Sequence, residues 1–164
     1  MDDILKLFLE TQQREAMQLA AESDLLELVV VDSQHYVATF RCRGLVRDAR
    51  GEVREHDRFS VGIFLSENYL RMANPAEILT WLEPSEIWHP NVRPPFVCLG
   101  KTTPGTPLVE LLHRCFELIT FENVGMREDD ALNQPACAWA RRNRERFPVD
   151  RRPIKRVAAE AAPC

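Results

Sequence analysis

Residues 87–101 read IWHPNVRPPFVCLGK and separate a strand-rich first part of the chain from a helical second part. Three prolines in this stretch each fix a backbone φ angle, which makes it more rigid than a linker. From residue 83 to residue 106 no period of two or of 3.6 persists, so we predict a long ordered loop. Ordered loops of this length are usually functional. We therefore expect the loop to present Cys98 as an exposed nucleophile beside Asn91.

The chain before this loop has the pattern of one helix and an antiparallel meander. Apolar residues recur at helical spacing from residue 3 to residue 22, after which Ser23 and Asp24 interrupt the pattern. The segment 47–51, RDARG, has the composition of a turn. Alternating or strand-like composition predicts four strands, at residues 25–31, 36–43, 59–65 and 76–82.

Helical spacing returns after the loop. The apolar residues of 108–119 share one helical stripe, and Asn133 is a good N-cap ahead of Pro135 in a further helix. Strands followed by helices are typical of the α+β class. We therefore predict an α+β domain over residues 1–148, followed by a basic C-terminal tail, 149–164, that is expected to be flexible.

Composition narrows the class of protein. The chain has 164 residues, of which 45% are hydrophobic and 28% charged, as expected for one globular domain. No apolar run approaches the roughly 20 residues that cross a bilayer, and the N-terminus carries acids where a secretory signal is basic. We expect a cytoplasmic protein with no membrane partner.

The cysteines and histidines do not suggest a metal site or a disulfide framework. The five cysteines are widely spaced and never form a CxxC pair, which indicates reduced thiols. The histidines outside the loop lack a ligand spacing, so we expect neither a metal nor a cofactor. Three residues, Trp81, Trp88 and Trp139, are interpreted as core rather than binding surface.

Charge is distributed unevenly along the chain. Residues 141–164 hold eight Arg or Lys and three acids, which leaves 13 basic and 22 acidic residues in 1–140. A basic segment of this kind can bind nucleic acid or an acidic protein. Because Phe147 is the one aromatic residue among these charges, we favour a solvated helix end and expect no nucleic-acid partner.

The long loop carries the motif of a known family. His89, Pro90 and Asn91 form the His-Pro-Asn triplet that precedes the active-site cysteine of ubiquitin-conjugating enzymes, and Cys98 follows within FVCLG. Two other stretches are similar to the family. Tyr69 and Asn74-Pro75 lie where it has a Tyr-Pro…Pro-Pro stretch, and EDDALNQPA at 128–136 resembles its acidic gate Asp-Asp-Pro-Leu.

The resemblance covers roughly residues 1–148 and implies both a fold and an activity. The implied fold is the ubiquitin-conjugating-enzyme-like one, with an N-terminal helix, a four-stranded antiparallel meander, a long active-site loop and C-terminal helices. The implied enzyme receives a ubiquitin-like protein from an activating enzyme as a thioester on Cys98. It then transfers this protein to an amine, expected to be a lysine of a protein acceptor.

The resemblance also implies roles for the residues around Cys98. The Asn91 side-chain amide would donate to the oxyanion formed when the amine attacks, although Asn91 could instead serve only as a loop brace. His89 and Pro90 would support the loop structurally. Asp130, and less directly Asp129, would orient or help deprotonate the incoming lysine. The alternative for both acids is that they merely precede a helix N-terminus, where the dipole favours them.

The sequence departs from many eukaryotic members in three ways. Six residues separate Asn91 from Cys98, one fewer than expected, and Gly100 and Lys101 follow where a Trp-Ser-Pro loop meets a RING ligase. The first helix carries mixed charges rather than basic ones. The loop after Cys98 therefore argues against a RING ligase partner, and the mixed charges argue against docking to an activating enzyme through a basic first helix.

The chain is more similar to stand-alone bacterial members, whose relatives are encoded in conjugation clusters associated with defence against phage. Two other interpretations stay open. One is a catalytically inactive scaffold on the same fold that binds the ubiquitin-like protein or the activating enzyme. The other is an unrelated structural α+β domain.

Overall fold

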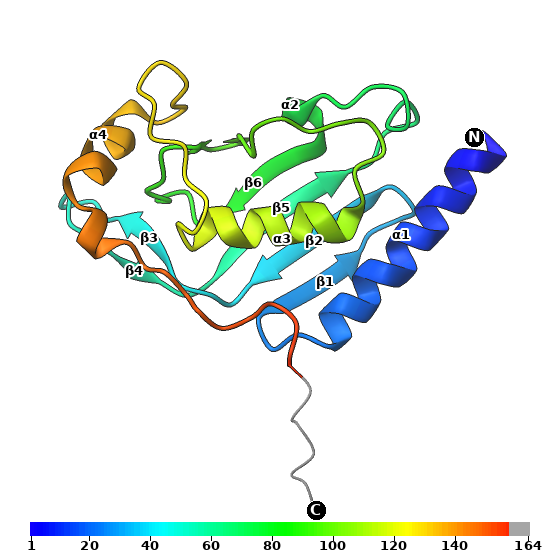
Figure 1. Cartoon of the computed structure of the whole chain (residues 1–164), viewed down its shortest axis with the longest axis horizontal. Helices are drawn as coiled ribbons and strands as arrows, with labels where there is room; N and C mark the ends of the chain where they lie inside the picture. Colours follow the sequence, from blue (N-terminus) through cyan, green and yellow to red (C-terminus); the bar gives the residue numbers. More distant parts are fainter. Residues whose placement is uncertain (158–164) are drawn as a thin grey trace, which may run out of the picture.

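The computed structural model describes residues 1–157 and shows a mixed α+β domain (Figure 1). Residues 158–164 of the predicted tail lie outside the described part. The elements follow one another as α1 (Asp3–Ala21), β1 (Leu26–Val30), β2 (His35–Phe40), β3 (Gly44–Arg47), β4 (Val53–His56), β5 (Phe59–Phe64), α2 (Pro75–Ile78), β6 (Leu79–Glu83), β7 (Val92–Arg93), β8 (Phe96–Val97), α3 (Leu108–Ile119), α4 (Gln134–Arg142) and the 3₁₀ helix η1 (Arg144–Arg146).

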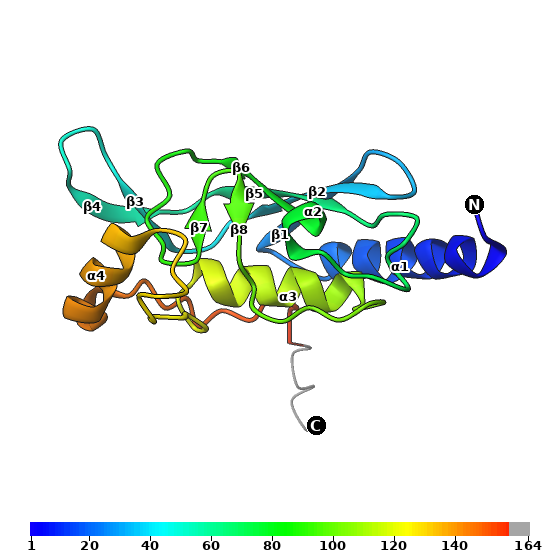
Figure 2. The same ribbon diagram turned by 90° about the horizontal axis from the view of Figure 1, so that it is seen from above.

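The main sheet is the predicted antiparallel meander, with strand order β1-β2-β5-β6. Helices α1 and α3 lie along one face of this sheet (Figure 2). The core forms between them because alternate strand residues such as Tyr36, Ala38 and Phe40 point to that face and are buried. The α+β prediction is confirmed.

Three local features differ from the predicted strands. Residues 76–78 form the helical turn α2, because Asn74 caps it and Pro75 occupies the first turn, so β6 begins only at Leu79. The second predicted strand ends at Phe40. Strands β3 and β4 then form a separate hairpin around the predicted turn at 47–51.

The hairpin β3–β4 is joined to the long loop that follows β6. The backbone N–H of Trp88 donates to the Leu45 carbonyl at 2.9 Å, and the N–H of Arg47 donates to the Glu86 carbonyl at 2.9 Å. Trp88 itself is buried, as is Trp81, whereas Trp139 of α4 is half-buried. The loop is therefore held between the main sheet and the hairpin.

Polar side chains fix the starts of the later helices. The Asn133 side chain accepts a hydrogen bond from the Ala136 N–H at 3.1 Å, so the predicted N-cap of α4 is confirmed. The start of α3 is capped by the buried Gln12 of α1, because the Gln12 Oε1 accepts a hydrogen bond from the Leu108 N–H at 2.8 Å. This contact links α1 to α3.

The described part of the C-terminal segment lies against the domain. Asp150 is 2% exposed and accepts hydrogen bonds from the Arg43 N–H and from the Arg152 guanidinium. Ile154 is buried, and the guanidinium of Arg156 donates to the last turn of α1. Contacts with the domain therefore continue to Arg156, past the predicted domain boundary at 148. None of the helices formed by residues 1–157 combines the length and the apolar composition that crossing a membrane requires.

Candidate active site

The loop around Cys98 is tied to the main sheet by a short hairpin. Strands β7 and β8 pair through Val92 and Val97, and the Trp81 N–H of β6 donates to the Pro95 carbonyl at 2.8 Å. Cys98 follows directly after β8. The nucleophile candidate thus stands at the end of a strand that the sheet holds in place, as the prolines of the loop predict.

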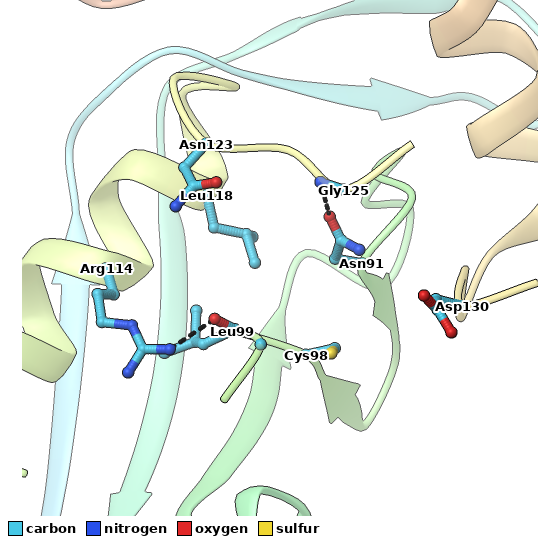
Figure 3. Close-up of a pocket in the computed structure, with 9 residues that line it drawn as sticks. Asn91, Cys98, Leu99, Arg114, Leu118, Asn123, Gly125 and Asp130 are labelled. Carbon is cyan, nitrogen blue, oxygen red and sulfur yellow. Dashed lines mark hydrogen bonds between the residues drawn. The ribbon is translucent and has the colours of Figure 1, made fainter. Parts of the chain in front are cut away.

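Asn91 is the centre of the hydrogen bonds in this loop. Its N–H donates to His89 Nδ1 at 3.0 Å and its carbonyl accepts from the Cys98 N–H at 2.9 Å. Its side-chain Oδ1 accepts from the Gly125 N–H at 3.0 Å (Figure 3). Within residues 1–157 the Nδ2 group makes no hydrogen bond, so both of its N–H donors stay free for another acceptor.

His89 is completely buried beside the aromatic ring of Phe121, with ring centroids 4.4 Å apart. Because Nδ1 accepts from Asn91, the proton of the neutral ring lies on Nε2, which faces no hydrogen-bond partner of ordinary geometry in the described chain. Burial lowers the pKa of His89 to about 3, with a smaller opposing effect from the Leu118 backbone. A ring this weakly basic is unsuited to accept a proton from a lysine.

The predicted supporting roles of His89 and Pro90 agree with this geometry. The Pro90 carbonyl accepts a hydrogen bond from the Asn133 N–H at 3.0 Å. The His-Pro-Asn triplet therefore connects Cys98, the loop after α3 and the start of α4. Asn91 bonds both Cys98 and Gly125, Pro90 bonds Asn133, and His89 holds the Asn91 backbone, which explains why a rigid segment is needed there.

Cys98 lines a pocket of about 460 Å³ together with Asn91 and Asp130 (Figure 3). Of the four cysteines in the described chain, Cys98 is the one that is partly exposed; Cys42, Cys115 and Cys137 are buried. Burial raises the pKa of each of the other three thiols, and that of Cys115 to about 12. Among these four cysteines, only the Cys98 thiol is therefore accessible to a thiol-reactive reagent in solution.

The structure separates the two acids of the predicted gate. Asp130 lies in the wall of the pocket facing the Cys98 thiol, on the loop that precedes α4 (Figure 3). Asp129 lies outside that wall and binds Arg127 at 2.8 Å, which lowers the pKa of its carboxyl. Arg127 Nε is also 3.5 Å from Asp130 Oδ2. Of the pair, Asp130 is the acid that shares the pocket with Cys98.

Three pocket residues are not predicted from the sequence. Arg114 of α3 reaches back across the pocket and donates to the carbonyls of Leu99 and Lys101 at 2.6 and 2.9 Å. It braces the chain just after Cys98. Asn123 and Gly125, on the loop after α3, complete the wall. A Cβ at Gly125 would lie 3.2 Å from the Asn91 Nδ2, so the missing side chain leaves that amide its space.

Comparison of the chain with protein-family models and with curated proteins gave no match. The evidence for a function is therefore the arrangement of its own residues. In the part of the chain that the structure describes, no three His, Cys, Asp or Glu side chains gather where they could bind a metal ion. The pocket offers one accessible thiol, one carboxylate, and the side-chain amides of Asn91 and Asn123, beside the guanidinium of Arg114.

Proposed function

We propose that the chain is a ubiquitin-conjugating-type transferase that carries a ubiquitin-like protein on Cys98 and transfers it to a lysine of a protein acceptor. The observation that carries the proposal is the shared pocket of Cys98, Asn91 and Asp130. Cys98 directly follows β8, Asn91 directly precedes β7, and Asp130 lies on the loop before α4. Their identities resemble the family motifs. The order of helix, meander, long loop and helices also supports a ubiquitin-conjugating-enzyme-like fold.

The first step is a thioester exchange. The Cys98 thiolate attacks the thioester carbonyl carbon that the activating enzyme presents, a new C–S bond forms, and the thiol of the activating enzyme leaves. Exposure of Cys98 at the pocket rim makes this approach possible. The buried cysteines cannot compete, because the attacking group must reach a second protein.

The second step transfers the acyl group to nitrogen. The neutral lysine amine attacks the carbonyl carbon, the C–N bond forms, the C–S bond breaks, and Cys98 recovers its electron pair. Negative charge develops on the carbonyl oxygen during attack, where the free N–H donors of Asn91 Nδ2 would stabilise it. Asp130 lies across the pocket, where it would orient the ammonium group and accept the proton that the nitrogen loses.

The test is formation of a thioester. The chain is incubated with an activating enzyme that charges itself, a ubiquitin-like protein and ATP, and is then run on a non-reducing gel. We expect a heavier band that thiol reductant removes, and that persists in Cys137→Ser as the matched control. In Cys98→Ser the band is lost or becomes resistant to reductant.

The proposal would be contradicted if the activating enzyme forms its own thioester with the ubiquitin-like protein but the wild-type chain forms no adduct. The function would then be the catalytically inactive scaffold, which binds the ubiquitin-like protein or the activating enzyme without taking the acyl group. Binding of either protein by the Cys98→Ser variant separates that scaffold from an unrelated domain.

A further inference from the structure

A second pocket lies at the end of the molecule opposite the N-terminus, where α4 stands beside the β3–β4 hairpin (Figures 1 and 2). Its volume is about 370 Å³, and it shares no lining residue with the Cys98 pocket. Arg47 of β3, Arg142 of α4 and Arg146 of η1 converge on it, and Trp88 and Trp139 form part of its wall. The proposed transfer reaction makes no use of these groups.

Two of the arginines are held in place before any ligand binds. The Arg47 guanidinium lies 4.8 Å from the ring centroid of Trp88 and donates to a backbone carbonyl of the hairpin. The Arg146 guanidinium lies 5.3 Å from the ring centroid of Trp139 and donates to another hairpin carbonyl. Cation–π contacts and these hydrogen bonds restrict both side chains, so less rotamer entropy is lost when an anion binds.

The donors in this pocket exceed the acceptors. Throughout residues 1–157, Arg47, Arg142 and Arg146 form no ion pair with a carboxylate, although acids outnumber bases in the chain. Trp88 is 8% exposed, and its indole N–H is buried without a hydrogen-bond partner. Three guanidinium groups without a carboxylate partner around one small pocket indicate an oxyanion that binds there.

We propose that this pocket binds an aspartate- or glutamate-rich segment of a partner protein through its carboxylates. Guanidinium groups pair with carboxylates bidentately, which suits a small pocket with several such groups. Glu52 also lines the wall, and this negative charge favours a singly charged carboxylate over a doubly charged phosphoryl group. The site uses two of the basic residues of the C-terminal segment, Arg142 and Arg146, that the proposed transferase chemistry leaves unexplained.

Nucleic acid fits the same pocket poorly. Single-stranded nucleic acid needs open aromatic faces for stacking and a basic groove that follows its backbone. Here the faces of Trp88 and Trp139 are covered by Arg47 and Arg146, and the formal net charge of the whole chain is −4. A compact anionic side chain is therefore the better match.

The three tryptophans of the chain provide a direct readout, because each gives one indole signal in a ¹H–¹⁵N spectrum. The probe is a soluble peptide of glutamate and glycine, titrated into the intact protein to about 1 mM, where weak complexes become populated. We expect saturable shifts of the Trp88 and Trp139 indoles. Trp81 lies outside the pocket, donates to the Pro84 carbonyl and should not move.

The matched variants are Arg142→Gln and Arg144→Gln, which remove one exposed charge each. Arg142 lines the pocket and Arg144 does not. Loss of one charged hydrogen bond should weaken peptide binding about tenfold in Arg142→Gln and less than about twofold in Arg144→Gln. Both side chains are exposed, so both variants should keep the wild-type melting temperature.

Three outcomes would overturn the proposal, and a fourth comes from a control peptide. They are the absence of saturable shifts at the two pocket indoles, equal weakening in Arg142→Gln and Arg144→Gln, and tighter binding of a thymidine oligonucleotide than of the glutamate peptide. A lysine–glycine peptide of the same length serves as the negative probe, and shifts of equal size with it would contradict recognition by charge.

Discussion

Replacement of Asn91 by Asp separates the two roles that this residue could have in the proposed transfer. Asp has nearly the shape of Asn and keeps an oxygen that can accept from the Gly125 N–H, so the loop brace survives. It lacks the N–H donors of Nδ2. Replacement by Ala, in contrast, removes both the brace and the donors.

The size of the effect follows from the lost donor. Removing one hydrogen bond to a developing oxyanion costs about 2.7–4 kcal/mol, or roughly 10²–10³ in rate. A carboxylate facing that oxyanion also repels it, so Asn91→Asp should lose at least this much. The brace alone, a neutral hydrogen bond at 3.0 Å, contributes about 1 kcal/mol. Asn91→Asp and Asn91→Ala are therefore both expected to transfer at least about 100-fold more slowly.

The assay is a single turnover. The chain is loaded at Cys98, the activating enzyme is stopped by removal of ATP, lysine is added, and loss of the thioester is followed on non-reducing gels. Loading itself should change far less than transfer. If Asn91→Asp discharged at nearly the wild-type rate while Asn91→Ala was slow, Asn91 would act as a brace only, and the oxyanion argument would be refuted.

Asp150→Asn should lower the free energy of unfolding by about 2 kcal/mol at pH 7, because hydrogen bonds from Arg152 lower the pKa of this buried carboxyl from 3.8 to about 2. The stabilisation is complete above the unfolded pKa near 4 and disappears as the pH falls toward 2, which urea unfolding across this range would show. Gly125→Ala should slow lysine discharge about tenfold by displacing the Asn91 amide, as measured in the same single-turnover assay. Arg114→Met should speed amide hydrogen exchange in residues 99–102, because two charge-assisted hydrogen bonds are lost, with a local cost of about 1–2 kcal/mol.

For each of these three predictions, one result would contradict the reasoning. For Asp150 the control is Asp57→Asn, which changes an exposed acid, and an equal loss of stability there would refute the burial argument. Wild-type discharge by Gly125→Ala would show that the amide has room to move. Unchanged exchange in Arg114→Met would mean that the loop after Cys98 holds its own conformation.

The main sheet could be predicted because burial on one face forces a period of two in the sequence. Other elements lack such a signal. The β3–β4 hairpin has short strands with charged residues on both sides of the turn, so its pattern does not differ from that of a loop. Gln12 is polar and gives no sign in the sequence that its amide would cap α3 across 96 residues.

The site could be predicted in part, for a related reason. Cys98, Asn91 and Asp130 stand out because their motifs are local in sequence and resemble those of a known family. Arg114 reaches the pocket from helix α3. Nothing in the sequence distinguishes this arginine from one whose side chain is solvated on a helix surface. The predicted basic tail, 149–164, contains Asp150, whose carboxyl is buried and accepts from the Arg43 N–H, 107 positions earlier in the chain.

The hydrogen bond from the Cys98 N–H to the Asn91 carbonyl bears on how long the proposed thioester would survive in water. Hydrolases often use the backbone N–H of the nucleophile itself, with an adjacent imidazole, to speed attack by water. Here that N–H is already engaged, and the imidazole of His89 is buried with its lone pair occupied. Water would find no imidazole beside the sulfur, only the carboxylate of Asp130, and one fewer donor for the oxyanion. Hydrolysis should therefore be slow, and the acyl group would persist until an amine that is itself a good nucleophile arrives.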